Sequence, residues 1–337
     1  MNNRITLSHG SGGRLSHDLI ENLFVKYFNN PILNRQTDSA IINGNFKNLA
    51  FTTDSYVVDP VFFPGGNIGK LAICGTVNDL AVSGARPVYI SVGFIIEEGL
   101  DMESLEKIVQ SMAQEAEIAN VKIVTGDTKV INKGKADKIF INTSGIGELD
   151  PSRKSLSFGK EILPGDKIIL NGDLGRHEIA IMTARENLGL KSTIESDCAS
   201  LNHLIESVLS AHEGVRFIRD ITRGGIATIL NELVGGKEFG IQIYENDIPV
   251  DDKIKSICEL LGLDSLFMAN EGRMLLVASP DEAHKIVNTL KDDPLGQNAA
   301  IVGEITSTNK CQVLMETEIG GKRIIDMLTG QQLPRIC

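Results

Sequence analysis

Residues 75–87 read GTVNDLAVSGARP, a stretch that combines the end of a helix, a glycine turn and the start of a strand. The residues before it, NIGKLAIC (67–74), begin a helical pattern that we expect to end at Gly84, because glycine is common where helices stop. From Pro87 on, PVYISVGFII is β-branched and aromatic, which predicts a strand. Asp79 stands inside the helical stretch, where aspartate is a weak helix former, so we expect it to have a function.

The same alternation of helix and strand continues in both directions from this stretch. Toward the N-terminus, LAFTTDSYVV (49–58) predicts a strand, and an amphipathic helix follows HGSGG (9–13). Toward the C-terminus the residue types predict helices at 101–119, 176–187, 194–212, 224–234 and 281–291, and strands at 121–126, 138–149, 166–172, 216–220, 239–245, 273–279 and 299–305.

A polar stretch with two prolines, DPSRKSLSFGKEILPGDK (150–167), separates two such α/β units, so we expect a domain boundary there. A chain of 337 residues with 42% hydrophobic content can bury a core in each unit. The predicted organisation is a Gly-rich N-terminal lid and helix (1–42), an N-terminal α/β domain (43–153), a C-terminal α/β domain (154–315) and a C-terminal tail (316–337).

The composition narrows the class of partner and the compartment. The net charge of −11 argues against nucleic acid and against an anionic membrane as the main partner. No apolar run approaches the roughly 18 residues of a membrane helix, and MNNRITLSHGSGG lacks the apolar region of a secretory signal. The scattered cysteines, with no C-x-x-C pair, exclude a cysteine-based zinc site and favour a reducing cytoplasm: Cys74, Cys198, Cys258, Cys311 and Cys337.

Aspartates recur at predicted strand ends and helix caps. Asp54 lies inside an apolar strand, where a carboxylate is costly to bury unless it is paired or bound to metal. Asp127 follows a predicted strand in VTGDTKV, and Asp220 precedes a Gly-Gly helix start. We favour function for Asp54 and Asp79, whereas capping of the helix explains Asp220 equally well. Mg²⁺ takes a few carboxylate oxygens and leaves its other positions to phosphates, which suits such a set.

A phosphate site of the P-loop type is absent, because GGNIGKL (65–71) has Pro64 and Leu71 where that motif needs glycine and serine or threonine. Gly12 and Gly13, which open the first helix, form a plausible phosphate cradle. The alternative is a flexible entry loop. Lys129 in TGDTKV and Glu271 in ANEGR are candidates for phosphate contact or proton transfer, with solvated loop charges as the alternative.

The chain ends in QQLPRIC, so a thiol stands on the last residue, Cys337. Chain ends are poorly ordered unless something ties them down, and a prenylation signal is excluded because that motif needs three residues after the cysteine. A frayed cysteine without function is one explanation, and a tethered nucleophile is the other. The segment after Gly330 can reach roughly 23 Å at about 3.3 Å per residue, which is enough to enter and leave a cleft.

These motifs together resemble one family. SHGSGGR, TTDSYVV, GTVNDLAVSGARP, TGDTKV, RDITRGG and ANEGR, closed by PRIC, are similar to the HypE carbamoyl dehydratases of hydrogenase maturation. That family belongs to the ATP-binding superfamily of aminoimidazole ribonucleotide synthetase, selenophosphate synthetase and thiamin-monophosphate kinase. The resemblance covers essentially the whole chain, and the terminal PRIC separates HypE from its relatives. Ile221 departs from the family, which usually has proline there.

The resemblance implies a fold and an activity. The fold would be α/β of the α+β type, with two domains like aminoimidazole ribonucleotide synthetase, mixed sheets and flexible terminal segments. A HypF-type carbamoyltransferase would place a carbamoyl group on Cys337. The enzyme would dehydrate this thiocarboxamide to a thiocyanate while hydrolysing ATP to ADP and phosphate. A HypC–HypD complex would then accept the cyano group for the iron of [NiFe]-hydrogenase, and the enzyme would be a cytoplasmic homodimer.

The resemblance also implies roles for residues. Cys337, Glu271 and Lys129 would be catalytic, with Glu271 the preferred base. Mg²⁺ would bind through Asp54, Asp79 and Asp127. ATP would be held by the residues Asp54, Asp79, Gly84, Asp127, Asn78, Gly12 and Gly13.

Other functions remain open at this point. A sister enzyme would phosphorylate a free small molecule such as thiamin phosphate or selenide, and Cys337 would then be incidental. The reactive cysteine or selenocysteine that selenophosphate synthetases carry near the N-terminus is missing from SHGSGG. A non-enzymatic scaffold that binds ATP to regulate docking belongs to a different class. A redox relay through Cys337 lacks a resolving cysteine nearby in the sequence.

Overall fold

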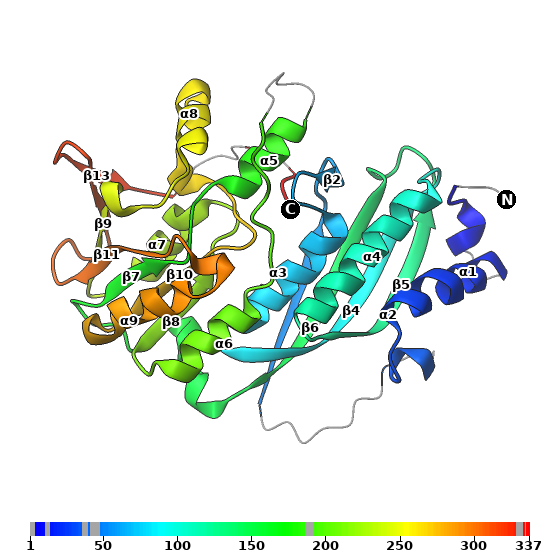
Figure 1. The fold of residues 1–337 in the computed structure, drawn as a ribbon, viewed down its shortest axis with the longest axis horizontal. Coiled ribbons are helices and arrows are strands. Elements are labelled where there is room, and N and C mark those ends of the chain that lie inside the picture. Colours follow the sequence, from blue (N-terminus) through cyan, green and yellow to red (C-terminus); the bar gives the residue numbers. More distant parts are fainter. Residues whose placement is uncertain are drawn as a thin grey trace.

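The computed structural model describes residues 4–10, 14–35, 40, 48–185, 192–327, 333 and 335–337. Two sheets with their helices lie side by side, each with its own core (Figure 1). Helix α1 (Arg14–Leu19) lies at the far end of the first unit, whereas the C-terminus lies at the junction of the two (Figure 1). The chain therefore ends between its two domains.

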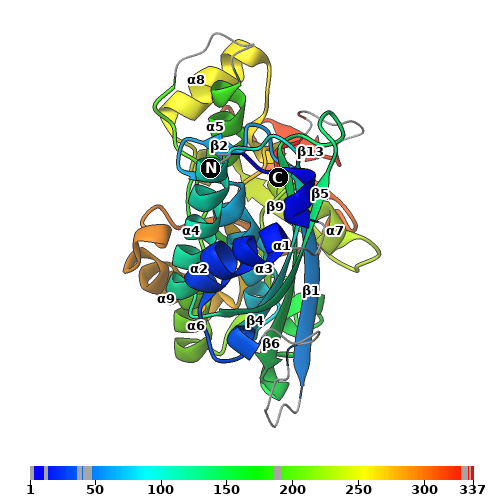
Figure 2. The same ribbon diagram turned by 90° about the vertical axis from the view of Figure 1, so that its right-hand side faces the viewer.

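The first sheet has four strands in the order β1-β6-β4-β5, namely β1 (Leu49–Tyr56), β6 (Ile139–Leu149), β4 (Ala85–Glu97) and β5 (Lys122–Ile131). It is mixed, because β4 and β5 are parallel while the other pairs are antiparallel. Within the described residues, helices cover one face of this sheet and leave the other face open (Figure 2). The covering helices are α1 (Arg14–Leu19), η2 (Ile20–Val25), α2 (Lys26–Phe28), α3 (Ile68–Val82) and α4 (Met102–Ile118).

The second sheet has seven strands in the order β13-β12-β9-β11-β7-β10-β8 and is also mixed. Its strands are β7 (Lys167–Leu170), β8 (Val215–Asp220), β9 (Gly240–Tyr244), β10 (Met274–Ala278), β11 (Ala300–Thr306), β12 (Val313–Glu316) and β13 (Lys322–Ile325). Its helices are α5 (Arg176–Ala184), α6 (Asn202–Ala211), α7 (Gly225–Val234), α8 (Asp252–Leu261) and α9 (Pro280–Lys291). A two-stranded ribbon, β2 (Phe62–Phe63) and β3 (Gly66–Asn67), precedes α3.

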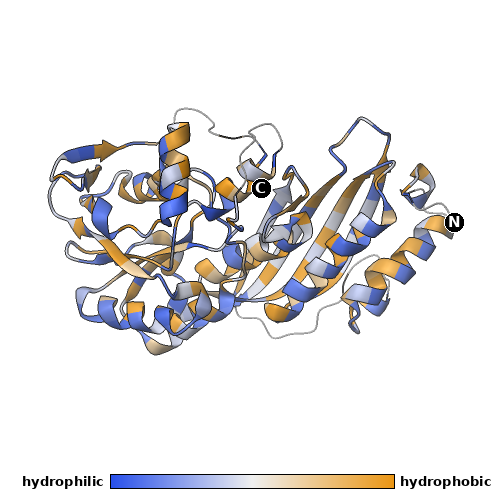
Figure 3. Cartoon of the chain, turned by 45° about the horizontal axis from the view of Figure 1, so that its top comes forward, coloured by the Kyte–Doolittle hydropathy of each residue, from blue (hydrophilic) through white to orange (hydrophobic). Residues whose placement is uncertain are grey.

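Helix α3, which contains Asp79, is the central element of the molecule. It packs on β1, β4 and β6 of the first sheet and also meets α6 and β8 of the second domain. Nearly all of its side chains are therefore buried, whereas α4 carries hydrophobic and hydrophilic residues along its length (Figure 3). Within the part of the chain that the structure describes, no helix has both the length and the apolar character needed to cross a membrane.

The structure differs from the sequence-based expectation in two segments. A helix was expected over 194–212, but α6 begins only at Asn202, and residues 192–201 run without helix. Tertiary hydrogen bonds hold this segment: Ser196 N donates to Pro64 O (2.8 Å) and Ala199 N donates to Glu271 O (3.3 Å). Residues 322–325, which the sequence assigns to the tail, form β13 of the second sheet.

Candidate active site between the two domains

The C-terminal tail is docked at the domain junction by its backbone. Val57 N donates to Cys337 O (3.2 Å) and Asp59 N donates to Arg335 O (3.3 Å), so residues 335–337 run beside the segment that follows β1. The Arg185 guanidinium donates to the same Arg335 oxygen (2.8 Å). Ile336 is buried in the first domain's core. The tail therefore has a built site in the folded chain.

The thiol of Cys337 lies among charged side chains from both domains. The pKa of this thiol is raised to about 12, mainly by burial and also by the negative charges of Glu271 and Asp54, while Arg223 acts in the opposite direction. Asp54 belongs to β1 of the first sheet, whereas Arg223 and Glu271 belong to loops of the second domain. The thiol is consequently neutral at physiological pH in this docked position.

Glu271 reaches the site because its neighbours fix the ANEGR loop. Its own N–H and that of Gly272 donate to the buried carboxylate of Asp197 (3.3 and 3.2 Å). Gly272 is required there, since a Cβ would stand 1.9 Å from the Asp197 backbone oxygen. The pKa of Glu271 lies well above its usual range, and burial is the main cause. The negative charges of Asp197, Asp220 and Asp54 also raise it, whereas Arg223 lowers it. A carboxyl of this kind holds a proton strongly once it receives one.

Three aspartates from different elements form a carboxylate cluster beside Glu271. Asp79 on α3 accepts a hydrogen bond from Thr52 Oγ1 (2.6 Å) and interacts with Asp54 on β1. Asp220 ends β8 of the second domain. Burial raises the pKa of Asp79 to about 6 and that of Asp220 to about 7, and neighbouring carboxylates contribute to both shifts. This mutual repulsion is what a divalent cation would relieve.

The fit of a metal to this cluster rests on charge and not on a ready-made geometry. Among the described residues, no three histidine, cysteine, aspartate or glutamate side chains converge as a metal site. Mg²⁺ keeps several waters and binds through one or two carboxylates plus substrate phosphates, so it does not need a closed protein cage. A Mg²⁺ that arrives with a phosphate would need only one or two of the carboxylates of Asp54, Asp79 and Asp220.

Asp127 and Lys129 lie elsewhere in the same chain. They stand on β5, which is three strands from β1 and hence roughly 14 Å away at about 4.8 Å per strand. Their side chains are exposed and form an ion pair (3.2 Å). In register, Asp127 pairs with Gly93 and Lys129 with Ile95. One copy of the chain does not bring either of them to Asp54, Asp79 or Cys337.

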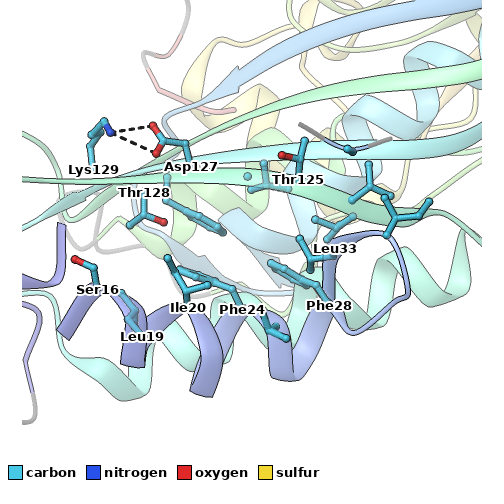
Figure 4. Close-up of a pocket in the computed structure, with 18 of the residues that line it drawn as sticks. Ser16, Leu19, Ile20, Phe24, Phe28, Leu33, Thr125, Asp127, Thr128 and Lys129 are labelled. Carbon is cyan, nitrogen blue, oxygen red and sulfur yellow. Dashed lines mark hydrogen bonds and ion pairs between the residues drawn. The ribbon is translucent and has the colours of Figure 1, made fainter. Parts of the chain in front are cut away.

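A pocket of about 360 Å³ lies between the N-terminal helix and strands β4 and β5. In Figure 4, Ile20, Phe24 and Phe28 lie on the helix below the strands, and Asp127 and Lys129 lie above them. The Phe24 and Phe94 rings stack with centroids 4.9 Å apart, which makes the pocket largely aromatic and aliphatic. Such lining suits a flat, partly apolar ligand.

The remaining predicted residues have other positions. Asn78 joins the domains: its side chain donates to Ala199 O (3.0 Å) and accepts from Leu201 N (2.7 Å). Gly84 has φ of +84° after α3, and a Cβ there would stand 2.9 Å from the Arg153 side chain, so it makes the turn into β4. Gly12 and Gly13 lie outside the described residues.

Sequence reasoning left the role of Asp220 open between capping and function, and it missed Arg223 and the buried His177 behind the site. Asp220 and Arg223 both belong to RDITRGG, so the motif carried a signal, but capping explained its aspartate equally well. His177 stands in an ordinary helical pattern, RHEIAIMTA, and nothing in that pattern points to the tail.

Comparisons with known proteins agree with this architecture. Residues 36–149 match the family description "AIR synthase related protein, N-terminal domain", and residues 164–316 match the corresponding C-terminal domain. The chain is 48% identical over 337 residues to the carbamoyl dehydratase HypE of Rhodobacter capsulatus, covering 99% of this chain and 98% of the relative. It is 45% identical to HypE of Escherichia coli, covering 99% of this chain and 100% of that protein.

Solved structures agree as well. A HypE hydrogenase maturation protein in complex with ATP superposes with a TM-score of 0.93 at 45% identity, covering 98% of this chain and 99% of that one. A HypE–HypF complex matches with a TM-score of 0.79 at 45% identity, covering 92% and 99%. A thiamine monophosphate kinase from Aquifex aeolicus, at 17% identity and a TM-score of 0.61, shares the fold. The family resemblance and the mixed two-domain fold are thus confirmed, and the chain belongs to the HypE carbamoyl dehydratases, within the AIR synthase related family.

Proposed function

We propose that this protein uses ATP to dehydrate a carbamoyl group carried on its own Cys337, converting the thiocarboxamide to a thiocyanate. The observation that carries the proposal is the docked tail: the terminal thiol lies in the domain junction, where Glu271 and Asp54 both act on its pKa. A sister kinase for a free small molecule would have no use for a thiol in this position.

The chemistry follows from the poor leaving ability of an amide oxygen. The amide oxygen attacks the γ-phosphorus of ATP, an O–P bond forms and the bond to the β-phosphate oxygen breaks, so ADP leaves. The C–O bond then breaks as phosphate departs with the electron pair, and the nitrogen gives up both protons, one to a protein base and one to the departing phosphate or solvent, to complete the C≡N bond. Phosphoryl transfer depends mostly on positioning and charge stabilisation, while the nitrogen needs a base.

The residues of the junction divide these tasks. Glu271, beside the thiol and held strongly basic by burial, receives a proton from the amide nitrogen. It must enter the cycle ionised, and the nearby Arg223 favours that state. Asp54 and Asp79, with Asp220 beside them, would hold Mg²⁺ and through it the phosphates. Mg²⁺ would supply charge neutralisation to the transferred phosphoryl group.

The base of the nucleotide would occupy the pocket between the N-terminal helix and β4–β5. Its aromatic and aliphatic walls suit a purine, and Asp127 and Lys129 border it as candidates for phosphate contact. Gly12 and Gly13, which precede α1 in the sequence and lie outside the described residues, stay candidates for phosphate contact. A relative that is 45% identical was solved with ATP, which supports a nucleotide site in this fold.

A second copy of the chain is the proposed cover for the open face of the first sheet. Phe51 is 70% exposed on β1, and Ile95, 43% exposed on β4, lies beside Lys129 on that face. Exposed apolar faces of this kind mark interfaces, and two-fold homodimers are the most common soluble assembly. A homodimer would place Asp127 and Lys129 against the partner and give these residues a route to a site shared between copies.

Other partners follow from the family. A HypF-type carbamoyltransferase would load Cys337, in keeping with the HypE–HypF complex solved for a relative, and a HypC–HypD complex would accept the cyano group. The five cysteines are free thiols, which suits work in the reducing cytoplasm.

The test uses a carbamoyl group whose oxygen carries a heavy isotope. If the amide oxygen is phosphorylated, the label leaves in inorganic phosphate after one turnover with Mg-ATP, detected by mass spectrometry. Label found in water or kept on the tail would contradict this mechanism. Phosphorylation of added thiamin phosphate or selenide, with an unchanged tail, would instead identify a sister enzyme.

A further inference from the structure

The tail is docked by its backbone and by two of its side chains. The Arg335 guanidinium donates to Val57 O (3.3 Å) and pairs with Asp137 (2.7 Å), and the Ile336 side chain is buried in the first core. The oxygens of Arg335, Ile336 and Cys337 each accept a hydrogen bond from the body of the protein. The Cys337 side chain takes no part in these bonds, so a group carried on the sulfur leaves them intact. The docking site can therefore hold the tail before and after modification.

Two side chains of the described protein body donate to the tail backbone, Arg185 to Arg335 O and His177 to Ile336 O. The bond from His177 is the one nearer to Cys337 in the sequence. His177 is fully buried on α5, and its Nε2 lies 2.9 Å from Ile336 O while its Nδ1 lies 2.7 Å from Ser196 Oγ. A carbonyl only accepts, so Nε2 carries the hydrogen. Ser196 donates to Nδ1 and itself accepts from Cys198 N (3.0 Å). This chain of bonds fixes one tautomer of the neutral ring.

The ring is also fixed in orientation and charge. Phe63 of β2 meets it edge to face with centroids 5.5 Å apart. Burial lowers the pKa of His177, and the charge of Asp197 and the bond to Ile336 raise it. A rigid, neutral donor thus faces the carbonyl one residue before the reactive sulfur.

We propose that His177 is the positioning residue of the substrate arm: its Nε2–H, oriented by Ser196, holds Ile336 O and so sets the place of the group on Cys337 relative to Glu271. The inference rests on the proposed dehydration but concerns a residue with no part in the bond changes. A misplaced carbamoyl group would lose the close approach that the reaction needs, even when the protein folds and the donor enzyme still loads it.

The experiment compares His177→Phe with His177→Gln, in a Cys311→Ser background that removes the exposed thiol outside the site. Iodoacetamide alkylation of Cys337, followed by mass spectrometry of the C-terminal peptide, reports how often the tail leaves its site. We expect His177→Phe to be alkylated roughly tenfold faster than the parent, as for the loss of one buried hydrogen bond. Glutamine keeps an N–H donor and should restore most of the protection.

His203→Phe is the matched control, because His203 also bonds a backbone oxygen, that of Ile118 (2.6 Å), far from the tail. It should leave alkylation unchanged. If His177→Phe does not fold, Ser196→Ala keeps the imidazole but removes the bond that orients it, together with the bond from Cys198 N, and should still speed alkylation. Equal alkylation of parent and folded variants would overturn the proposal.

A second readout separates this inference from the proposed function. After loading by the carbamoyltransferase, His177→Phe should carry the carbamoyl group as fully as the parent but lose water from it more slowly when Mg-ATP is added. Equal rates of water loss would also overturn the positioning role. A parent protein that is never carbamoylated would remove the proposed function, while the alkylation rates would still decide whether His177 holds the tail.

Discussion

The backbone N–H of Val57 donates a hydrogen bond of 3.2 Å to the backbone oxygen of Cys337, so the last residue of the chain lies beside the end of β1. The same strand carries Asp54, which with Tyr56 faces α3: Tyr56 donates to Asp54 Oδ2 (3.2 Å). The contact thus brings the terminal thiol and the carboxylate cluster to one end of one strand. This arrangement is the basis of the predictions below.

Replacing Glu271 by glutamine should lower the rate of dehydration about a hundredfold or more, since glutamine cannot accept the amide proton. ATP binding, measured by calorimetry, should change little. Glu178→Gln is the control, because Glu178 is a buried carboxyl with a raised pKa on α5, bonded to Ala269 N (2.7 Å). Full dehydration activity in Glu271→Gln would remove this residue from the mechanism.

The docked thiol predicts an unusual pH dependence of alkylation. Docking raises the pKa of Cys337 from 9.0 to about 12, so the docked state holds its proton more tightly than the free tail. Docking is therefore fully favoured below about pH 9 and weakens as the pH rises toward 12. The alkylation rate of the C-terminal peptide in the folded protein should keep rising above pH 9, where that of the isolated peptide levels off. Parallel curves would show that the tail is not held inside.

Magnesium should stabilise the protein more at high pH than at low pH. The pKa values of Asp79 and Asp220 are raised to about 6 and about 7, so the metal-free fold gains stability from their protons at low pH and loses it as the pH rises through these values. Adding Mg²⁺ to the protein with ATP should raise the melting temperature more near pH 8 than near pH 5.5.

The variant Asp220→Asn removes one of the two titrating groups and should flatten this pH dependence. Asp166→Asn is the control, because Asp166 is a buried carboxyl with a raised pKa that is paired with Arg216 in the second domain. If Mg²⁺ raises the melting temperature of the parent protein by the same amount at both pH values, this result would argue against a metal at the carboxylate cluster.

The open face of the first sheet predicts a homodimer. Phe51→Asp places a charge in the centre of an interface and should convert the protein to monomers in analytical ultracentrifugation at micromolar concentration. Phe158→Asp is the matched control, since Phe158 is 62% exposed but lies in a short helical turn between the domains. A parent that sediments as a monomer would leave Asp127 and Lys129 without the proposed route to a shared site.

Local patterns predicted most of the secondary structure because those elements follow their own periodicity. The stretch from Ile68 to Glu97 is helix, turn and strand as expected, and the glycine at 84 makes the turn. The helix prediction for residues 194–201 failed. The apolar residues of this segment have helical spacing, but its hydrogen bonds go to Pro64 and Glu271, which are far away in the sequence. No local pattern contains such partners.

Some residues of the candidate site could be predicted from local motifs, and others could not. Asp54, Asp79, Glu271 and Cys337 were predicted from motifs, and the structure brings them together. Asp127 was grouped with them by residue type, but the strand order of the first sheet places it at the opposite edge, and strand order is not written in any single strand. His177 could not be found from the sequence, since its role depends on where the tail lies.

The most direct test of the account is intact-mass spectrometry of the C-terminal peptide after co-production with the carbamoyl donor, with and without Mg-ATP. The account predicts a carbamoyl group on Cys337 that loses the mass of one water only when ATP is present. A peptide that stays unmodified, while ATP is consumed with some free small molecule, would contradict it.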